Sequence, residues 1–284
     1  MKYRADPSHP NVPSTLRHYG IRPIKMRGQH FLINDAISHR IVNAASLSED
    51  SVVLEIGAGT GALTRFLTAV DEHVIAIEID KKLVHLLNCE YESYENLTIV
   101  NQNVLDLDMT ALAATHQTEI FTVVSNLPYN ITGPVLDLLI THRKVIKQAI
   151  IMVQNEVGTR LVATPGTKAY GILSIVMPYY FQIESLFRVA GGNFIPRPEV
   201  ESVVLRLTPL AEPPVVVKDP AELFRFVKDT FQQRRKMLHH AVNRHAPGAV
   251  EQIARQTGID LRRRGETLTL AEFAELANAI YDVQ

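Results

Sequence analysis

Residues 126–129, Asn-Leu-Pro-Tyr, are the part of this chain best suited to chemistry on an amine. They follow an apolar run at residues 121–125, Phe-Thr-Val-Val-Ser, which predicts a buried parallel strand. The side-chain oxygen of Asn126 and the carbonyl of Leu127 can accept hydrogen bonds from an exocyclic NH2 group, and the ring of Tyr129 offers a face for stacking. This pattern therefore indicates a site that grips a flat heterocycle bearing an amine.

A second aromatic residue stands in the loop at residues 193–200, which Pro196 and Pro198 stiffen. We expect Phe194 in this loop to lie opposite Tyr129 and to complete an aromatic sandwich around a flipped base. The alternative is that Phe194 only covers the edge of a sheet. Asn-Leu-Pro-Tyr resembles the motif of methyltransferases that modify amino groups of nucleic acid bases, although a Pro-Tyr pair after a strand is also common in simple turns.

A glycine-rich turn at residues 57–61, Gly-Ala-Gly-Thr-Gly, follows a predicted buried strand at residues 52–56 and leads into a helix beginning near Ala62. Glycines allow a sharp turn and let a ligand approach the main chain closely, with the helix N-terminus directed at it. Gly57 and Gly59 are therefore predicted cofactor-binding residues. The spacing also satisfies a dinucleotide-binding pattern through Ala62, so the loop alone does not separate a nicotinamide cofactor from S-adenosylmethionine.

Two more polar side chains follow the next two predicted strands. Glu78 comes directly after the strand at residues 74–77, where an acid can accept hydrogen bonds from the ribose diol of either cofactor. Asp80 is expected to cap the next helix instead. Asn103 follows the strand at residues 97–100, at a position that normally edges the adenine ring of the cofactor.

The remaining pattern continues the alternation of strands and helices. Helices are predicted at residues 35–45, 134–141 and 156–162, and strands at residues 148–153, 172–179 and 202–207. Alternation at this spacing predicts an α/β fold with a doubly wound, mainly parallel sheet and right-handed crossovers. The four candidate sites, at Gly57, Glu78, Asn103 and Asn126, then lie at the carboxyl ends of strands, where such sheets bind ligands.

The two ends of the chain differ from this α/β part. Residues 1–27 contain four prolines and no helical or strand period, which predicts an irregular basic arm. A Pro-rich linker at residues 208–214 separates the α/β part, residues 28–212, from a predicted helical domain at residues 213–284. Its Arg234, Arg235 and Lys236 form a cluster suited to RNA phosphates, although three adjacent charges can also mark a solvated helix end.

Composition excludes several classes of protein. The 284 residues, 46% of them hydrophobic, suffice for a full core, and no apolar run approaches the roughly 18 residues of a membrane span, so we expect a soluble cytoplasmic protein. One cysteine excludes an internal disulfide and a Cys-rich zinc site, and no metal site is predicted. Residues 1–30 hold six Lys/Arg against one Asp/Glu, residues 31–125 hold four against fourteen, and residues 218–264 hold eleven against five. A polyanion can meet the two basic regions and a cationic cofactor the acidic one between them, unless all three are only solvated faces.

Together the motifs resemble the ribosomal RNA small-subunit adenine dimethyltransferase family, from Gly28 to the C-terminus. The matching segments are residues 28–32 (Gly-Gln-His-Phe-Leu), 55–61, 126–131, 168–171 (Lys-Ala-Tyr-Gly), 194–198 and 231–238. The resemblance implies a Rossmann-like S-adenosylmethionine-dependent methyltransferase sheet with a small C-terminal helical domain. It also implies dimethylation of the exocyclic amines of two adjacent adenines in the 3′-terminal hairpin loop of small-subunit (16S) rRNA, in ribosome biogenesis, with the rRNA or the assembling 30S particle as partner. A monomer is the default expectation.

The same resemblance implies roles for individual residues. They are His30 and Leu32 at the lip of the cofactor site, Gly57 beneath the methionine part, Glu78 at the ribose, Asn103 at the adenine, and Asn126 between methyl donor and target. The family usually has Asp where this chain has Asn103. An Asn keeps one acceptor oxygen for the adenine amine but loses the negative charge, so cofactor affinity is the property that this difference affects.

The sequence leaves three other interpretations open. Related enzymes that modify a large-subunit rRNA adenine typically have Ile at the position of Leu127 and lack the basic helical pattern of residues 234–236. A non-catalytic RNA-binding or assembly factor would not need the intact motif at residues 126–129, although Asn103 is compatible with it. A nicotinamide-dependent oxidoreductase would need hydride-transfer residues, which the sequence does not supply.

Overall fold

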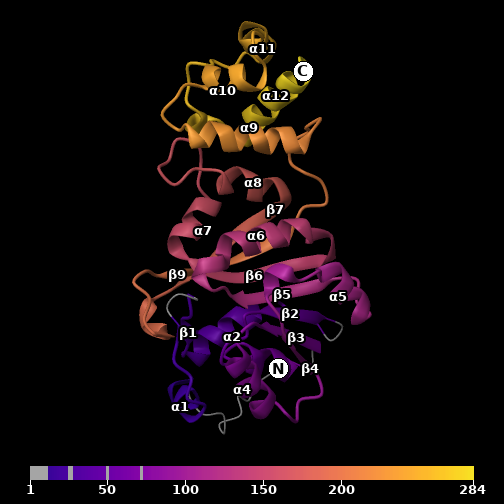
Figure 1. The fold of residues 1–284 in the computed structure, drawn as a ribbon, viewed down its shortest axis with the longest axis vertical. Coiled ribbons are helices and arrows are strands. Elements are labelled where there is room, and N and C mark those ends of the chain that lie inside the picture. Colours follow the sequence, from indigo (N-terminus) through magenta and orange to yellow (C-terminus); the bar gives the residue numbers. More distant parts are fainter. Residues whose placement is uncertain (1–11, 25–27, 49–50, 71–72) are drawn as a thin grey trace. The chain divides into compact units, whose positions relative to one another are not determined.

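The computed structural model describes residues 12–24, 28–48, 51–70 and 73–284 (Figure 1). It divides into two compact units, Met1–Gly158 with Gln182–Pro209, and Thr159–Phe181 with Leu210–Gln284. The first is built around a sheet and the second is helical. No helix of the described ranges has both the length and the apolar character needed to cross a bilayer.

The first unit contains a seven-stranded sheet. Its strands, in spatial order, are β4 (Leu97–Asn101), β3 (His73–Glu78), β2 (Val52–Ile56), β5 (Phe121–Asn126), β6 (Ile146–Gln154), β9 (Ser202–Pro209) and β7 (Phe181–Val189). The first five strands are parallel, and β9 runs antiparallel to β6. The predicted doubly wound Rossmann-like sheet is thus confirmed, and its strand order reverses between β2 and β5.

The helices of this unit form largely where the sequence predicts them. They are α1 (Val12–His18), α2 (Asp35–Ala44), α3 (Thr64–Leu67), α4 (Lys81–Glu90), α5 (Met109–Thr115) and α6 (Thr132–Thr141). α7 (Asn155–Leu161) follows β6 and continues into the second unit, which begins at Thr159. Asp80 caps α4 as predicted, because its side chain accepts a hydrogen bond of 3.0 Å from the backbone N–H of Lys82. Asn34 and Asp108 cap α2 and α5 in the same way.

Three predictions about local structure are wrong. Residues 12–18 of the predicted irregular arm form helix α1, because Leu16 packs into a buried cluster and tertiary contacts outweigh weak local periodicity. The helix after the glycine turn begins at Thr64 rather than near Ala62. The strand predicted at residues 172–179 is helix α8 (Leu173–Tyr180). Its buried residues lie all around the helix, so its sequence lacks the one-sided apolar stripe by which a helix is recognised.

A two-stranded antiparallel sheet joins two distant segments of the first unit. β1 (Phe31–Leu32) pairs with β8 (Phe194–Ile195), so that Leu32 lies opposite Phe194. Asn34 donates from its side chain to the side-chain oxygen of Asn193 at 2.8 Å, which extends the pairing. The two family-like segments 28–32 and 194–198 are therefore held as one structural element.

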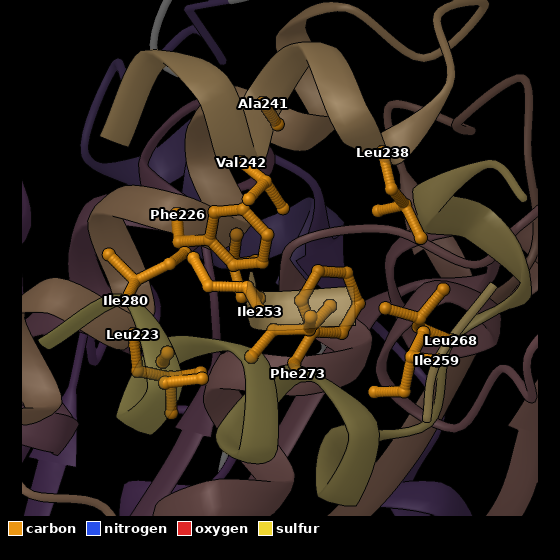
Figure 2. Close-up of a cluster of buried hydrophobic side chains, with 14 of the residues drawn as sticks. Leu223, Phe226, Leu238, Ala241, Val242, Ile253, Ile259, Leu268, Phe273 and Ile280 are labelled. Carbon is orange, nitrogen blue, oxygen red and sulfur yellow. The ribbon is translucent and has the colours of Figure 1, made fainter. Parts of the chain in front are cut away.

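The second unit has α8, α9 (Pro220–Gln232), α10 (Leu238–His245), α11 (Val250–Thr257) and α12 (Leu270–Tyr281) around one hydrophobic core (Figure 2). On α9 the buried residues Leu223, Phe226, Val227 and Thr230 recur at helical spacing. Tyr170 is buried in the same core and donates a hydrogen bond of 2.7 Å to the carbonyl of Leu268. Residues 159–181, which the sequence analysis assigned to the α/β part, are thus packed in the helical unit.

One buried hydroxyl in this core gives a prediction about stability. The Oγ1 atom of Thr230 is buried and has no hydrogen-bond partner among the described residues. We expect Thr230→Val to raise the free energy of unfolding by about 1 kcal/mol, because a methyl group of the same shape removes an unsatisfied polar atom. Urea denaturation measures the change.

Tyr170→Phe is the matched control, since it removes a hydroxyl that has a partner in the same core. It should lower the free energy of unfolding by about 1–2 kcal/mol. A Thr230→Val protein less stable than the wild type would contradict this account of the core.

Candidate active site

A cavity opens at the carboxyl ends of the parallel strands of the first unit. Its walls come from residues 28–32, 55–60, 77–79, 102–104 and 126–131, together with Ala62, Leu63 and Leu83. The predicted residues that line it are His30, Leu32, Gly57, Gly59, Glu78, Asn103, Asn126, Leu127 and Tyr129. Residues from five separate stretches of sequence therefore meet at one place, next to the reversal of strand order.

The glycine turn forms the floor of this cavity and is tied to the end of β3. Gly57 has a φ of +71° and Gly59 a φ of +61°, a backbone region that strongly favours glycine. The N–H of Gly57 donates to the carbonyl of Ile77 at 2.8 Å, and the N–H of Gly59 donates to the Glu78 carboxylate at 2.9 Å. The turn is thus held open in a shape that presents main chain rather than side chains to a ligand.

Glu78 is buried at the end of β3 beside the turn. One carboxylate oxygen accepts from the N–H of Gly59 and the other from the N–H of Asp80, each at 2.9 Å. Burial raises the pKa of Glu78, and the backbone donors oppose that shift. Since each oxygen has a second lone pair, the carboxylate can still accept hydrogen bonds from a pair of ligand hydroxyls.

Asn103 lines the cavity beyond the end of β4. Its side-chain oxygen accepts from the N–H of Leu105 at 3.2 Å, and its amide nitrogen donates to Asp106 at 3.0 Å. Both ends of the amide therefore hold the short turn Val104–Asp106. The side chain offers a ligand one remaining acceptor site on the oxygen and no formal charge.

Asn126 is the last residue of β5, and its amide orientation is determined by a neighbouring carbonyl. The side-chain nitrogen donates to the backbone carbonyl of His30 at 3.2 Å. A carbonyl can only accept hydrogen bonds, so the amide nitrogen of Asn126 must be the atom that faces His30. The amide oxygen of Asn126 then points away from His30 and is free to accept a hydrogen bond. In the described part of the chain, no group donates to this oxygen or to the carbonyl of Leu127.

The ring of Tyr129 is held from two sides. Its hydroxyl shares a hydrogen bond of 2.7 Å with the hydroxyl of Ser202, and burial raises its pKa. The His30 ring lies 5.0 Å from it between centroids, at an interplanar angle of 31°. His30 is positioned in turn by a hydrogen bond of 2.7 Å from its Nδ1 to the carbonyl of Pro196.

Phe194 does not face Tyr129 across the cavity. Its ring is only 2% exposed and belongs to a hydrophobic cluster that includes Leu32 and Val189. The pairing of β8 with β1 carries the side chain into this cluster. The aromatic sandwich expected from the sequence is therefore not formed in this structure, where Phe194 is a core residue.

Two polar residues of the cavity wall were not predicted. Glu55, the residue before the last of β2, is 1% exposed; it accepts a hydrogen bond of 2.6 Å from Thr64, and burial raises its pKa to about 8. The signal in the sequence that could have identified Glu55 is an acidic residue inside an otherwise apolar strand. The Oγ1 atom of Thr60 is buried without a partner among the described residues, so this wall has unused hydrogen-bonding capacity for a polar ligand.

The sequence of residues 24–282 matches the protein family described as ribosomal RNA adenine dimethylase. The chain belongs to this family. A Geobacillus thermodenitrificans protein named Ribosomal RNA small subunit methyltransferase A is 43% identical over 93% of each chain. A Bacillus mycoides protein of the same name is 38% identical over 99% of this chain and 98% of its own.

Two solved structures share the fold of this dimethylase family member. A dimethyladenosine transferase from Plasmodium falciparum has 25% identity and a TM-score of 0.69 over 87% of this chain and 96% of its own. The 23S rRNA methyltransferase ErmE has 25% identity and a TM-score of 0.66 over 88% of this chain and 99% of its own. The family identity makes this chain an enzyme of the methyltransferase class and excludes the oxidoreductase interpretation.

In the helical unit of this dimethylase, the three predicted RNA-binding residues differ in environment. Arg234 is paired with Glu266 at 2.6 Å and donates to the carbonyl of Lys168 at 3.1 Å. Arg235 and Lys236 are exposed, and neither has an ion-pair partner in the described ranges. Arg234 therefore has a structural contact, and the other two cations are available to a ligand.

Buried Glu55 gives a prediction about pH dependence. A carboxyl group with a folded-state pKa near 8 and an ordinary unfolded-state pKa binds more protons in the native state, so its contribution to stability is lost as pH rises from about 4.5 to about 8. Glu55→Gln cannot titrate and keeps an acceptor for Thr64. Between pH 5 and 8 the wild type should lose stability relative to the variant, on the order of 2–4 kcal/mol.

Urea denaturation of both proteins at several pH values tests this. Thr64→Val, which removes the hydroxyl donor to Glu55, is the control for a simple loss of the contact. Parallel stability profiles for wild type and Glu55→Gln would show that the carboxyl group does not titrate as described.

Proposed function

We propose that this protein transfers methyl groups from S-adenosylmethionine to the exocyclic amines of two adjacent adenines in the 3′-terminal hairpin loop of small-subunit rRNA. The observation that carries the proposal is the fixed amide of Asn126, whose oxygen is a free acceptor inside a cavity with a glycine floor. The names of the relatives at 38–43% identity support the small subunit as the source of the RNA. The protein acts in the cytoplasm as a monomer on the assembling subunit.

The cavity residues fit the methyl donor by their chemistry. The donor supplies an electrophilic methyl group on a positively charged sulfur. Gly57 and Gly59 leave room for the methionine part of the donor against the main chain. The Glu78 carboxylate accepts hydrogen bonds from the ribose hydroxyls. Asn103 edges its adenine, and His30 and Leu32 form the lip. The unpaired hydroxyl of Thr60 adds a polar contact on the same wall.

Asn126 and Leu127 activate the target amine. The lone pair of an adenine amine is delocalised into the ring, so the group is a poor nucleophile. When its two N–H groups donate to the Asn126 oxygen and the Leu127 carbonyl, a pyramidal nitrogen is favoured and its lone pair turns away from the ring, toward the methyl group. The displacement is in line, and the proton of the methylated amine is acidic enough to leave to solvent.

Tyr129 holds the plane of the target base. Its hydroxyl is anchored to Ser202 and one side of its ring lies near His30, so that the ring cannot turn freely. A base stacked on Tyr129 is then held in a single plane relative to the Asn126 oxygen. The second methylation starts from an amine with one N–H, which needs only one acceptor, so space beside Asn126 matters more than an added catalytic group.

The experiment measures methyl transfer from labelled S-adenosylmethionine to undermethylated small ribosomal subunits, followed by nucleoside analysis. Wild type should form dimethyladenosine, and Asn126→Ala should reduce the rate by about 100-fold or more, because an acceptor aligned in the transition state is lost. Binding of S-adenosylhomocysteine, measured by calorimetry, checks that the variant still has a formed cavity.

Large ribosomal subunits serve as the alternative substrate in the same assay. Transfer to them alone would replace the small-subunit proposal. No transfer to either particle by a wild type that binds RNA would remove the enzymatic proposal and favour an assembly factor.

The basic cluster of the helical unit gives a matched pair of variants. Arg235→Ala with Lys236→Ala should weaken binding of small-subunit rRNA by about tenfold at moderate salt with unchanged thermal stability, because exposed cations are removed. Arg234→Ala should instead lower the stability of the protein, since the ion pair with Glu266 and the contact with Lys168 are lost. Equal RNA affinity in the double variant and the wild type would exclude this cluster from the RNA site.

A further inference from the structure

We infer that a second cleft of the α/β unit, lined by residues 20–22, Ile24 and residues 79–82, binds phosphate groups of the substrate RNA. This inference rests on the proposed function. The cleft lies between the segment that follows α1 and the start of α4. Residues 20–24 belong to the basic region 1–30, which the charge pattern of the sequence predicts to meet a polyanion.

Unpaired positive charge is the main feature of this cleft. Arg22, Lys81 and Lys82 line it and are exposed, and none of them has an ion-pair partner in the described part of the chain. Asp80 is the only acid among the lining residues, and its side chain accepts from the N–H of Lys82 to cap α4. The cleft therefore has three cationic side chains and one acid, and that acid is already used to cap α4. It also lies at the N-terminus of α4, where the helix dipole is positive, and both features favour an anionic ligand.

Packing fixes these cations in place before a ligand arrives. Ile21 is 8% exposed and shares a hydrophobic cluster with Leu83 and Leu86 of α4. Tyr19 donates from its hydroxyl to Glu90 at 2.8 Å, at the far end of the same helix. Because the segment is docked along α4, Arg22 is held beside the two lysines, and less side-chain and backbone entropy is lost on binding.

The apolar part of the cleft lining favours a nucleic acid over a small anion. Ile24 is 39% exposed and Ile79 is 55% exposed, so the lining presents apolar surface as well as cations. Ribose and base edges can cover such surface while the flanking phosphates meet the charges, whereas an inorganic ion would leave it in water.

The position of the cleft links it to the reaction. Ile79 lines both this cleft and the cofactor cavity, on either side of the end of β3. The cofactor cavity itself contains the carboxyl groups of Glu55 and Glu78, whose ionised forms suit a cationic ligand and disfavour a phosphate. The two neighbouring sites therefore have opposite charge preferences, so phosphates of the RNA bind at the cleft while only the uncharged target base enters the cavity.

The test is the salt dependence of RNA binding, measured by fluorescence anisotropy with an unmethylated small-subunit rRNA fragment that contains the 3′-terminal hairpin. Lys81→Gln with Lys82→Gln should reduce the slope of log affinity against log salt concentration by about 1.5 and lower the affinity several-fold at 0.1 M salt. Adding Arg22→Gln should reduce the slope further. Lys81→Arg with Lys82→Arg should restore the wild-type slope, because the charges are kept.

Lys144→Gln with Lys147→Gln is the matched control. These lysines are exposed just before and at the start of β6, at the end of the sheet opposite the cavity, and the double variant removes the same amount of charge. It should leave the slope unchanged. The affinity for S-adenosylhomocysteine should be the same in all variants, since none of the changed side chains lines the cofactor cavity.

The outcomes separate this inference from the proposed function. A wild type that methylates RNA, together with an unchanged slope in Lys81→Gln/Lys82→Gln, would overturn the inference alone. Equal slope changes in the test and control pairs would also overturn it, since they would show that RNA affinity depends on the net charge of the protein and not on this cleft. A loss of S-adenosylhomocysteine affinity in the test pair would assign the cleft to the cofactor instead. A wild type that neither binds nor methylates RNA would overturn both proposals.

Discussion

The reversal of strand order between β2 and β5 is the constraint on which the site depends. β3 and β4 continue the sheet on one side of β2, and β5 and β6 continue it on the other. With right-handed crossovers, the chains that leave β2 and β5 turn to opposite faces of the sheet, and a crevice is left between them. The glycine turn follows β2 and Asn126 ends β5, so both lie at that crevice, where the proposed function places the cofactor and the target amine. A hydrogen bond of 2.6 Å from Ser125 to the carbonyl of Ile56 ties the two strand ends together.

A small second sheet determines which way the side chains of Asn126 and His30 face. β1 and β8 bring the His30 carbonyl to the Asn126 amide and the Pro196 carbonyl to the His30 ring. Each carbonyl can only accept, so each contact selects one orientation of a side chain that is otherwise ambiguous. The reactivity expected of Asn126 thus depends on main-chain atoms from both ends of the α/β unit rather than on another catalytic side chain.

The charge of the cavity is arranged for a cation. Glu55 and Glu78 are both buried, and burial raises the pKa of each. A positively charged ligand beside them would favour their ionised forms and lower those pKa values, so ligand binding and proton release are coupled. The basic cleft on the other side of Ile79 favours an anionic ligand instead. In the proposed function, a cationic cofactor and a polyanionic substrate therefore bind at adjacent sites at the same end of the sheet.

The sequence by itself determined the features that depend on neighbouring residues: the apolar runs of the parallel strands, the glycine turn, the Asp80 cap, and the placement of Gly57, Glu78, Asn103 and Asn126 at strand ends. Those signals are local, because strand period, turn chemistry and capping act over a few residues. Tertiary structure alone decided that residues 173–180 form a helix, that Phe194 is buried in the core, and that Arg234 pairs with Glu266. Each of these outcomes depends on partners far away in sequence, which supply burial or opposite charge that no local pattern reports.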